Sequence, residues 1–199
     1  MLTLNSKNII KARKMLFIIT DFMDLHGIKY FLEGGTLLGV VRDGDLLPWD
    51  HDVDISITQE DAINFDKLRW KLLLKGYWVT RRKTHKKFGP FVPNDYRVFK
   101  MKPLAPYLLK IIYPKVAERM LVVDVFVKKD DEHHTYWQAM EKLLRVDKTH
   151  YDSQDFIQFM GRNLSVPHNY KDYLSKKYGD WTIPVREWSC KDDEKTIVD

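Results

Sequence analysis

Residues Leu32–Ile57 read LEGGTLLGVVRDGDLLPWDHDVDISI and join a glycine turn to a strand with acidic residues at alternate positions. Side chains of an extended strand alternate between its two faces. One face carries the apolar residues, which are Val53, Ile55 and Ile57. The other carries Asp52, Asp54 and, if the strand reaches that far, Asp50, spaced about 7 Å apart along the chain. Such carboxylates repel one another unless a cation lies between them, and Mg²⁺ or Mn²⁺ prefers oxygen ligands of this kind.

A glycine turn precedes this strand and predicts a phosphate site. Gly34 and Gly35 follow the apolar run 28–32, and residues 36–41 have the composition of a helical turn. Gly35 and Thr36 are therefore expected at a helix N-terminus, where backbone N–H groups are free to bind phosphate. An Asp-x-Asp pair alone is common in loops, but beside a phosphate cradle it supplies the minimum equipment for metal-assisted phosphoryl or nucleotidyl transfer.

A third acidic residue, Asp124, stands in the middle of the apolar run 121–127. A lone buried carboxylate costs several kcal/mol unless it is paired or bound to a cation. An ion pair with Arg97 or Arg119 is the structural alternative to an active-site role. Arg97 lies in a predicted strand, where an ion pair with Asp50 or Asp124 and a contact with substrate phosphate are equally compatible with the sequence.

Several of these residues form an ordered signature. GGTLLG at 34–39, Arg42, DGD at 43–45 and PWDHDVD at 48–54 resemble the LicD family, which includes bacterial phosphocholine transferases. That family is similar to the DNA polymerase beta nucleotidyltransferase superfamily, in which a glycine pair precedes two strand carboxylates and a third lies on a later strand. The resemblance implies an α+β fold with a mixed β-sheet flanked by helices, and it continues more weakly through residues 96–127 and 166–181.

The resemblance also implies a reaction. A phospho-alcohol of the phosphocholine or ribitol-phosphate type would pass from a CDP-activated donor to a hydroxyl of a glycan or similar acceptor, releasing CMP. Asp52, Asp54 and Asp124 would be the catalytic and metal-binding residues, with Asp50 as a further ligand or an orienting group. Asp124 would complete the metal site or act as general base. The turn at Gly34 would bind the diphosphate, assisted by Arg42 and Arg97.

Composition bounds the domain organisation. The 199 residues, 44% of them hydrophobic, predict a single domain over 1–190 with a catalytic core at about 7–130, a helical extension at about 131–190 and a charged, disordered tail at 191–199. The single cysteine, Cys190, excludes an internal disulfide and a cysteine-rich zinc site. Neither a secretory signal nor a run of about 18 apolar residues is visible, so a cytoplasmic or otherwise soluble protein is expected.

The charge balance leaves other functions open. A net charge of +5 suggests an anionic partner, and the densest basic run, residues 81–87, fits a solvated loop, a phosphate-rich substrate or nucleic acid, in that order. Without a helix-turn-helix, zinc-finger or RNA-recognition signature, no nucleic-acid partner is expected. The alternatives are an NTP-dependent nucleotidyltransferase that releases pyrophosphate and a non-catalytic basic nucleic-acid-binding module.

Periodicity and capping residues predict two helices in the catalytic core. Apolar residues recur at helical spacing over 7–26, with Ser6 as a candidate N-cap and Gly27 as the residue after the C-terminus. A second helix is expected from Thr58, its N-cap, to about Lys75.

Further elements are predicted beyond that helix. Strands are expected at 77–82 and 96–101, and the apolar run 107–113 is expected to be a short core helix or, alternatively, a lid. Residues 133–146 are predicted to form one helix. The aromatic residues near the C-terminus either close the core or stack on a base or sugar; they are Tyr170, Tyr173, Tyr178 and Trp181.

Overall fold

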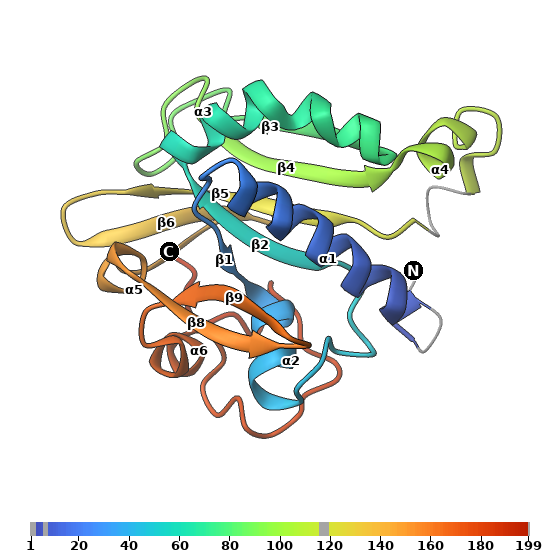
Figure 1. Cartoon of the computed structure of the whole chain (residues 1–199). Coiled ribbons are helices and arrows are strands. Elements are labelled where there is room, and N and C mark those ends of the chain that lie inside the picture. The colour runs from blue at the N-terminus through green and yellow to red at the C-terminus, as the bar shows by residue number, and fades with distance from the viewer. Residues whose placement is uncertain (1–2, 6–7, 116–119, 199) are drawn as a thin grey trace.

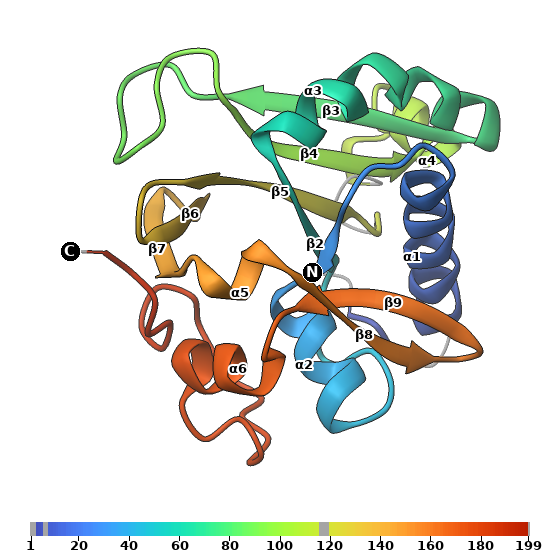
Figure 2. The ribbon, with the colours of Figure 1, turned by 60° about the vertical axis from the view of Figure 1, so that its left-hand side comes forward.

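A mixed β-sheet with helices on both sides forms the centre of the molecule, and a separate β-hairpin packs beside it (Figures 1 and 2). The computed structural model describes residues 3–5, 8–115 and 120–198. Its elements are, in chain order, α1 (Asn8–Leu25), β1 (Phe31–Leu32), α2 (Gly34–Arg42), β2 (Val53–Thr58), α3 (Gln59–Leu68), the 3₁₀ helix η1 (Arg69–Lys75), β3 (Tyr77–Lys83), β4 (Tyr96–Pro103), α4 (Leu104–Leu109), β5 (Val123–Asp130), β6 (His134–Ala139), β7 (Lys142–Asp147), α5 (Thr149–Asp152), β8 (Gln154–Phe159), β9 (Arg162–Pro167) and α6 (Tyr170–Tyr178).

The strand order β1-β2-β5-β4-β3 confirms the predicted α+β, nucleotidyltransferase-like fold. Strands β2 and β5 run parallel in the centre, and the other neighbouring pairs are antiparallel. Strand β5 also pairs with β6, which continues into β7, whereas β8 and β9 form their own two-stranded sheet. The two central strands are therefore the ones that carry the predicted aspartates.

One face of the sheet is apolar and packs against α1 and α3. Phe65 of α3 lies 6.0 Å from Phe22 of α1 and 5.0 Å from Phe99 of β4, measured between ring centroids. The alternating apolar residues of β2 and β5 are at most 1% exposed; they are Val53, Ile55, Ile57, Val123, Val125 and Val127. Because their neighbours along each strand point the other way, the aspartates lie on the opposite face.

The predicted helix ends are largely confirmed. The side chain of Thr58 accepts a hydrogen bond from the Asp61 N–H at 3.1 Å and caps α3. The segment then continues as η1 and ends at Gly76, whose φ of +84° is the left-handed conformation that glycine adopts readily. Helix α1 ends before Gly27, at φ +63°. The candidate N-cap, Ser6, lies outside the described residues.

The predicted helix at 133–146 is wrong, because these residues form the hairpin β6–β7. Met140 and Glu141 have φ values of +48° and +63°, which suit a two-residue hairpin turn. Trp137 and Leu144 pair directly across the hairpin and are at most 2% exposed, whereas Met140 is 74% exposed at the turn. Strands β8 and β9 form a second hairpin. The prediction of a helical C-terminal part is therefore wrong, because residues 131–190 form mainly hairpins and contain only two helices, α5 and α6, among their described elements.

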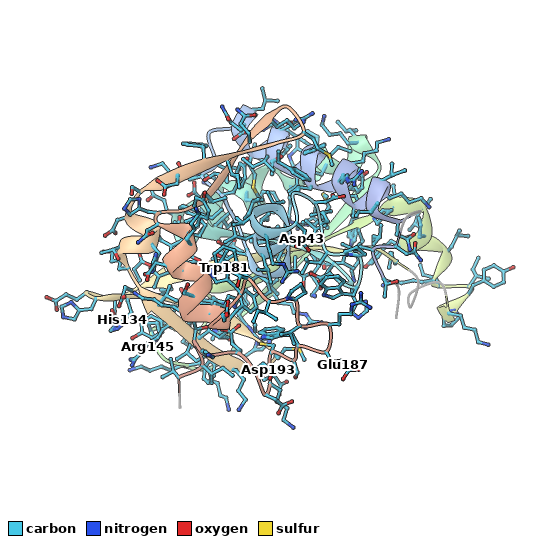
Figure 3. All side chains as sticks on the ribbon, turned by 90° about the horizontal axis from the view of Figure 1, so that it is seen from below. Asp43, His134, Arg145, Trp181, Glu187 and Asp193 are labelled. Carbon is cyan, nitrogen blue, oxygen red and sulfur yellow. The ribbon has the colours of Figure 1, made fainter. Side chains whose placement is uncertain are left out.

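The predicted disordered tail is also wrong over its described residues. The N–H of Val198 donates to the carbonyl of Leu143 at 2.8 Å, and the Arg145 N–H donates to the carbonyl of Thr196 at 2.8 Å, so the tail pairs with β7. Figure 3 shows the segment that carries Trp181, Glu187 and Asp193 crossing the lower side of the molecule.

The apolar run 107–113 is exposed rather than buried. Ile111 and Ile112 are 75% and 71% exposed.

No helix in the described part of the chain is both long enough and apolar enough to cross a membrane.

Candidate active site

Three aspartates from the two central strands converge on the polar face of the sheet. Asp54 of β2 is the direct register partner of Asp124 of β5, and Asp52 immediately precedes β2. Each of the three offers one carboxylate oxygen, and these oxygens lie within 4.8 Å of one another. The geometry therefore brings together the two strand carboxylates and the later one, as the sequence predicted.

The group is electrostatically strained. Burial, followed by the charges of Asp50 and Asp124, raises the pKa of Asp52 to about 7. Burial, followed by the charge of Asp52, raises the pKa of Asp54 well above its usual range. Several ionised carboxylates this close together are unfavourable without a compensating cation.

One lysine compensates this charge only in part. Lys100 of β4 is the register partner of Asp124, and its Nζ donates to Asp124 Oδ2 at 2.5 Å. The other oxygen, Asp124 Oδ1, is buried and has no hydrogen-bond partner in the described structure. An unpartnered carboxylate oxygen beside two further carboxylates fits a divalent cation with oxygen ligands. The ion pair predicted for Asp124 is thus made by Lys100, not Arg97; Arg119 lies outside the described residues.

The glycine turn lies against the carboxylates. Gly34 begins α2 with φ +53°, and a Cβ there would stand 2.7 Å from Asp54 Oδ2. The side chain of Thr36 is buried and accepts a hydrogen bond from the Asp54 N–H at 2.8 Å, so it holds β2 against the helix. Gly34 and Gly35 line the same cavity as the aspartates. The N-terminus of α2, whose first N–H groups lack partners within the helix, is therefore beside the acidic group.

Asp50 lies next to the three converging aspartates but outside their group. Its Oδ1 accepts a hydrogen bond from the His51 N–H at 2.8 Å, and its Oδ2 would be 2.0 Å from a Cβ at Gly35. Burial raises the pKa of Asp50, while a hydrogen bond with Asp52 is among the contacts that lower it. Of its two predicted roles, this position suits an orienting group better than a ligand.

A cavity of about 620 Å³ opens over the aspartates. Its walls come from segments far apart in sequence, including β4, the β6–β7 hairpin and the chain after α6. Its cationic lining residues include Arg42, Arg82, Arg97, Lys100 and Arg186. Aromatic residues also line it, namely Trp49, Phe126, Trp137, Tyr178, Trp181 and Trp188. A site with acidic, basic and aromatic walls can accommodate a metal, a diphosphate and an apolar or ring-shaped group.

Arg97 reaches this cavity through a β-bulge. The register with β3 shifts between Arg82, which pairs with Val98, and Lys83, which pairs with Tyr96, so Arg97 is the extra residue. Tyr96 consequently turns to the α3 side, and Arg97 lines the cavity although simple alternation places it on the opposite face. Its Nε is buried without a hydrogen-bond partner in the described structure.

Arg42, the other predicted phosphate-binding arginine, also lines the cavity but is already engaged. Its Nε and Nη2 donate to the two carboxylate oxygens of Asp43 at 2.7 and 2.9 Å, and its guanidinium lies 5.8 Å from the centre of the Trp49 ring. Arg97 is therefore the less constrained of the two for binding a new anion.

A buried polar cluster that was not predicted from the sequence surrounds Glu33, the residue before the turn. Its carboxylate accepts hydrogen bonds from Ser56 at 3.0 Å, from Tyr173 at 2.7 Å and from Tyr151. Lys128 of β5 places its Nζ 3.1 Å from Glu33 Oε1. Since the Glu33 N–H also donates to the carbonyl of Asp54 at 3.0 Å, the cluster fixes the turn relative to the acidic strand.

Charge compensation keeps this cluster ionised. Burial favours the neutral acid, but Lys128, Lys177 and the two tyrosine hydroxyls together lower the pKa of Glu33. Burial lowers the pKa of Lys128 to about 8, so the amine still carries its proton near neutral pH. Lys177 is itself paired with Glu194 of the tail at 2.5 Å. The sequence around Glu33, Lys128 and Lys177 contains no local pattern that predicts this arrangement.

Comparison with known proteins places the chain in a family. Residues 27–169 match the family described as LicD/FKTN/FKRP, nucleotidyltransferase domain. A 51-residue stretch is 47% identical to the ribitol 5-phosphate transferase FKRP of Mus musculus, and equally to that of Homo sapiens, covering 26% of this chain and 10% of each relative.

A longer stretch of 107 residues is 32% identical to an uncharacterized protein of Rickettsia typhi (strain ATCC VR-144 / Wilmington), covering 52% of this chain and 35% of the relative. These alignments thus span between 10% and 35% of the relatives' own lengths. The family match covers well over half of the chain, from Gly27, two residues after α1, to Asn169, two residues after β9. The chain therefore belongs to the LicD/FKTN/FKRP nucleotidyltransferase family.

Proposed function

We propose that the protein is a metal-dependent transferase that moves a phospho-alcohol from a CDP-activated donor to a hydroxyl of a glycan or similar acceptor and releases CMP. The observation that carries the proposal is the convergence of Asp52, Asp54 and Asp124 beside the N-terminus of α2. Family membership and the similarity to a ribitol 5-phosphate transferase support this class of reaction.

The acidic group has the donor set of a Mg²⁺ or Mn²⁺ site. Asp52, Asp54 and Asp124 would hold the cation, which would neutralise charge on the diphosphate and on the leaving CMP. Asp50, hydrogen-bonded to Asp52, would keep that carboxylate oriented. Lys100 would restrain the Oδ2 of Asp124 and leave its Oδ1 directed toward the reaction.

The remaining residues of the chain would bind and orient the substrates. The free N–H groups at Gly34, Gly35 and Thr36 would donate to the donor phosphates, as helix N-termini do. Arg97 would add a charge-assisted contact to a phosphate oxygen, because its Nε is unpartnered and its side chain faces the cavity. If Asp124 does not complete the metal site, its unpartnered Oδ1 would instead accept the proton of the attacking hydroxyl as a general base.

The test is CMP release from a panel of CDP-alcohols, including CDP-choline and CDP-ribitol, with Mg²⁺ or with EDTA. Wild type is expected to release CMP from at least one donor only with the metal, and Asp52→Asn is expected to lose at least about a hundredfold in rate. Asp152→Asn, which changes an exposed carboxylate at the end of α5, is the control. Equal turnover by wild type and Asp52→Asn would reject the assigned role. Pyrophosphate release from ATP or CTP instead would identify an NTP-dependent nucleotidyltransferase.

A further inference from the structure

A group of large apolar side chains is exposed at one end of the sheet. Its members, here called the end patch, are between 36% and 79% exposed; they are Trp70, Leu74, Trp78, Leu108, Leu109, Ile111, Ile112 and Tyr113. They come from η1, from the start of β3 and from α4 with the chain that follows it. None of them belongs to the metal site or the donor-phosphate site proposed above.

The structure holds these three segments together. The Leu104 N–H at the start of α4 donates to the carbonyl of Gly76 at 2.8 Å, which joins α4 to the end of η1. Trp78 of β3 stacks on Tyr107 of α4 with ring centroids 5.8 Å apart. Figures 1 and 2 both place α4 at the end of the β3–β4 pair, where the segments that carry the end patch meet.

The surroundings of the end patch are strongly basic. The segments that form the patch, residues 69–80 and 102–115, contain six Lys and Arg residues and no Asp or Glu; the six are Arg69, Lys71, Lys75, Lys102, Lys110 and Lys115. Lys110 and Lys102 lie within the patch, with their Nζ atoms 3.9 and 6.0 Å from the centre of the Tyr107 ring. These segments thus combine exposed aromatic and aliphatic groups with cations and no carboxylates.

The exposed apolar groups and the cations of the end patch together favour one kind of partner over the others. A second copy of the chain would bring like charges together across the patch, and nucleic acid offers no hydrocarbon for isoleucine and leucine side chains. An anionic bilayer offers both partners at once, because its acyl region accepts the apolar groups while its headgroups attract the lysines. Tryptophan, tyrosine and lysine are the residues that prefer the boundary between these two regions.

We propose that the end patch binds the surface of an anionic phospholipid bilayer. Ile111, Ile112 and Tyr113 enter the headgroup–acyl boundary, and Lys110 and Lys102 contact the lipid phosphates. Strand β4 connects this surface with the candidate active site, because Lys102 and Lys100 lie on the same face of the strand about 7 Å apart. The inference does not depend on the proposed reaction, since binding is measured without substrate.

The experiment is co-sedimentation of the full chain with vesicles of phosphatidylcholine alone or of phosphatidylcholine mixed with phosphatidylglycerol. Wild type is expected to bind the mixed vesicles at least about tenfold more tightly. Ile111→Asp/Ile112→Asp is expected to reduce that binding at least about tenfold, and Lys110→Glu at least about fivefold. Ile111 and Ile112 are exposed and Lys110 is half-buried, so the substitutions are expected to leave the fold intact. Circular dichroism checks that each variant is folded. Phe156→Asp, at a 62% exposed apolar residue of β8, is the matched control and is expected to bind as wild type.

Equal binding to neutral and mixed vesicles, or wild-type binding by the double variant, would overturn the proposal. So would binding of a duplex oligonucleotide that the same substitutions abolish, or a dimer that Ile111→Asp/Ile112→Asp dissociates, because either result assigns the patch to another partner. If wild type binds the mixed vesicles as expected but releases no CMP from any donor, only the proposed reaction is contradicted.

Discussion

Replacing Asp52 by asparagine is expected to have opposite effects on stability with and without a divalent cation. In the folded, metal-free protein the pKa of Asp52 is about 7, against a usual value of 3.8. The contribution of Asp52 to the free energy of unfolding is therefore fully present below pH 3.8 and is lost as pH rises through 7. The difference between the two pKa values corresponds to a loss of about 4 kcal/mol above pH 7. Because the side chain is partly exposed, we expect Asp52→Asn to recover about 2–4 kcal/mol at pH 8 in EDTA.

The assay is thermal and urea denaturation at pH 8, in EDTA and in excess Mg²⁺. In EDTA the Tm of Asp52→Asn is expected to exceed that of wild type by at least about 4 °C. Mg²⁺ at a hundredfold excess over its Kd stabilises wild type by about 2.7 kcal/mol, and the variant is expected to lose most of this gain.

A carboxylate in the opposite situation provides the control for this experiment. The hydrogen bonds of Tyr136 and of two backbone N–H groups lower the pKa of the exposed Asp131 to about 2, so Asp131→Asn is expected to destabilise the fold equally with and without Mg²⁺. An Asp52→Asn protein that is less stable than wild type in EDTA, or that gains as much from Mg²⁺, would refute the reasoning.

Two further substitutions and one deletion test the surroundings of the site. Glu33→Gln leaves Lys128 buried without its counter-ion and is expected to lower the free energy of unfolding, measured in urea above pH 4.5, by about 3–5 kcal/mol. The difference from wild type should shrink as pH falls below 4.5, because the Glu33 carboxylate of wild type then becomes protonated as well. A difference that does not depend on pH would contradict this. Gly35→Ala places a Cβ 2.0 Å from Asp50 Oδ2, so CMP release is expected to fall at least about tenfold while the open-space control Gly44→Asn retains activity. Deleting residues 191–199 removes the partner of Lys177 and two hydrogen bonds to β7, and calorimetry should show a Tm lowered by several degrees; an unchanged Tm would mean that the tail does not stabilise the fold.

The acidic centre was predictable because its signals are local. The alternation around Asp52 and Asp54 fixes which face each side chain occupies, and a single charge inside 121–127 marks Asp124 as paired or bound. The glycine pair was equally informative, since it predicted a helix N-terminus near Gly35 and α2 begins at Gly34. The relative position of the two strands followed from the family resemblance and was then found in their direct register.

Other features depend on tertiary contacts that no local pattern encodes. Lys100 pairs with Asp124 only because β4 and β5 are antiparallel in one particular register. Residues 133–146 fit helical spacing as well as alternation, and the positive φ values at the turn decide for a hairpin. Glu194 looked like part of a solvated tail, yet it is buried because Lys177 needs a counter-ion. Charged residues that neutralise each other in the interior are indistinguishable from surface residues in the sequence.

The single extra residue in β4 makes chain length, and not only residue identity, a determinant of the site. Deleting Tyr96 would restore regular pairing and bring Arg97 opposite Lys83, so that the Arg97 guanidinium left the cavity and faced the hydrocarbon around Phe65. An unpaired guanidinium is poorly tolerated in such surroundings. Insertions and deletions should therefore be accepted in the preceding loop, residues 84–95, and rejected within the strand that follows it.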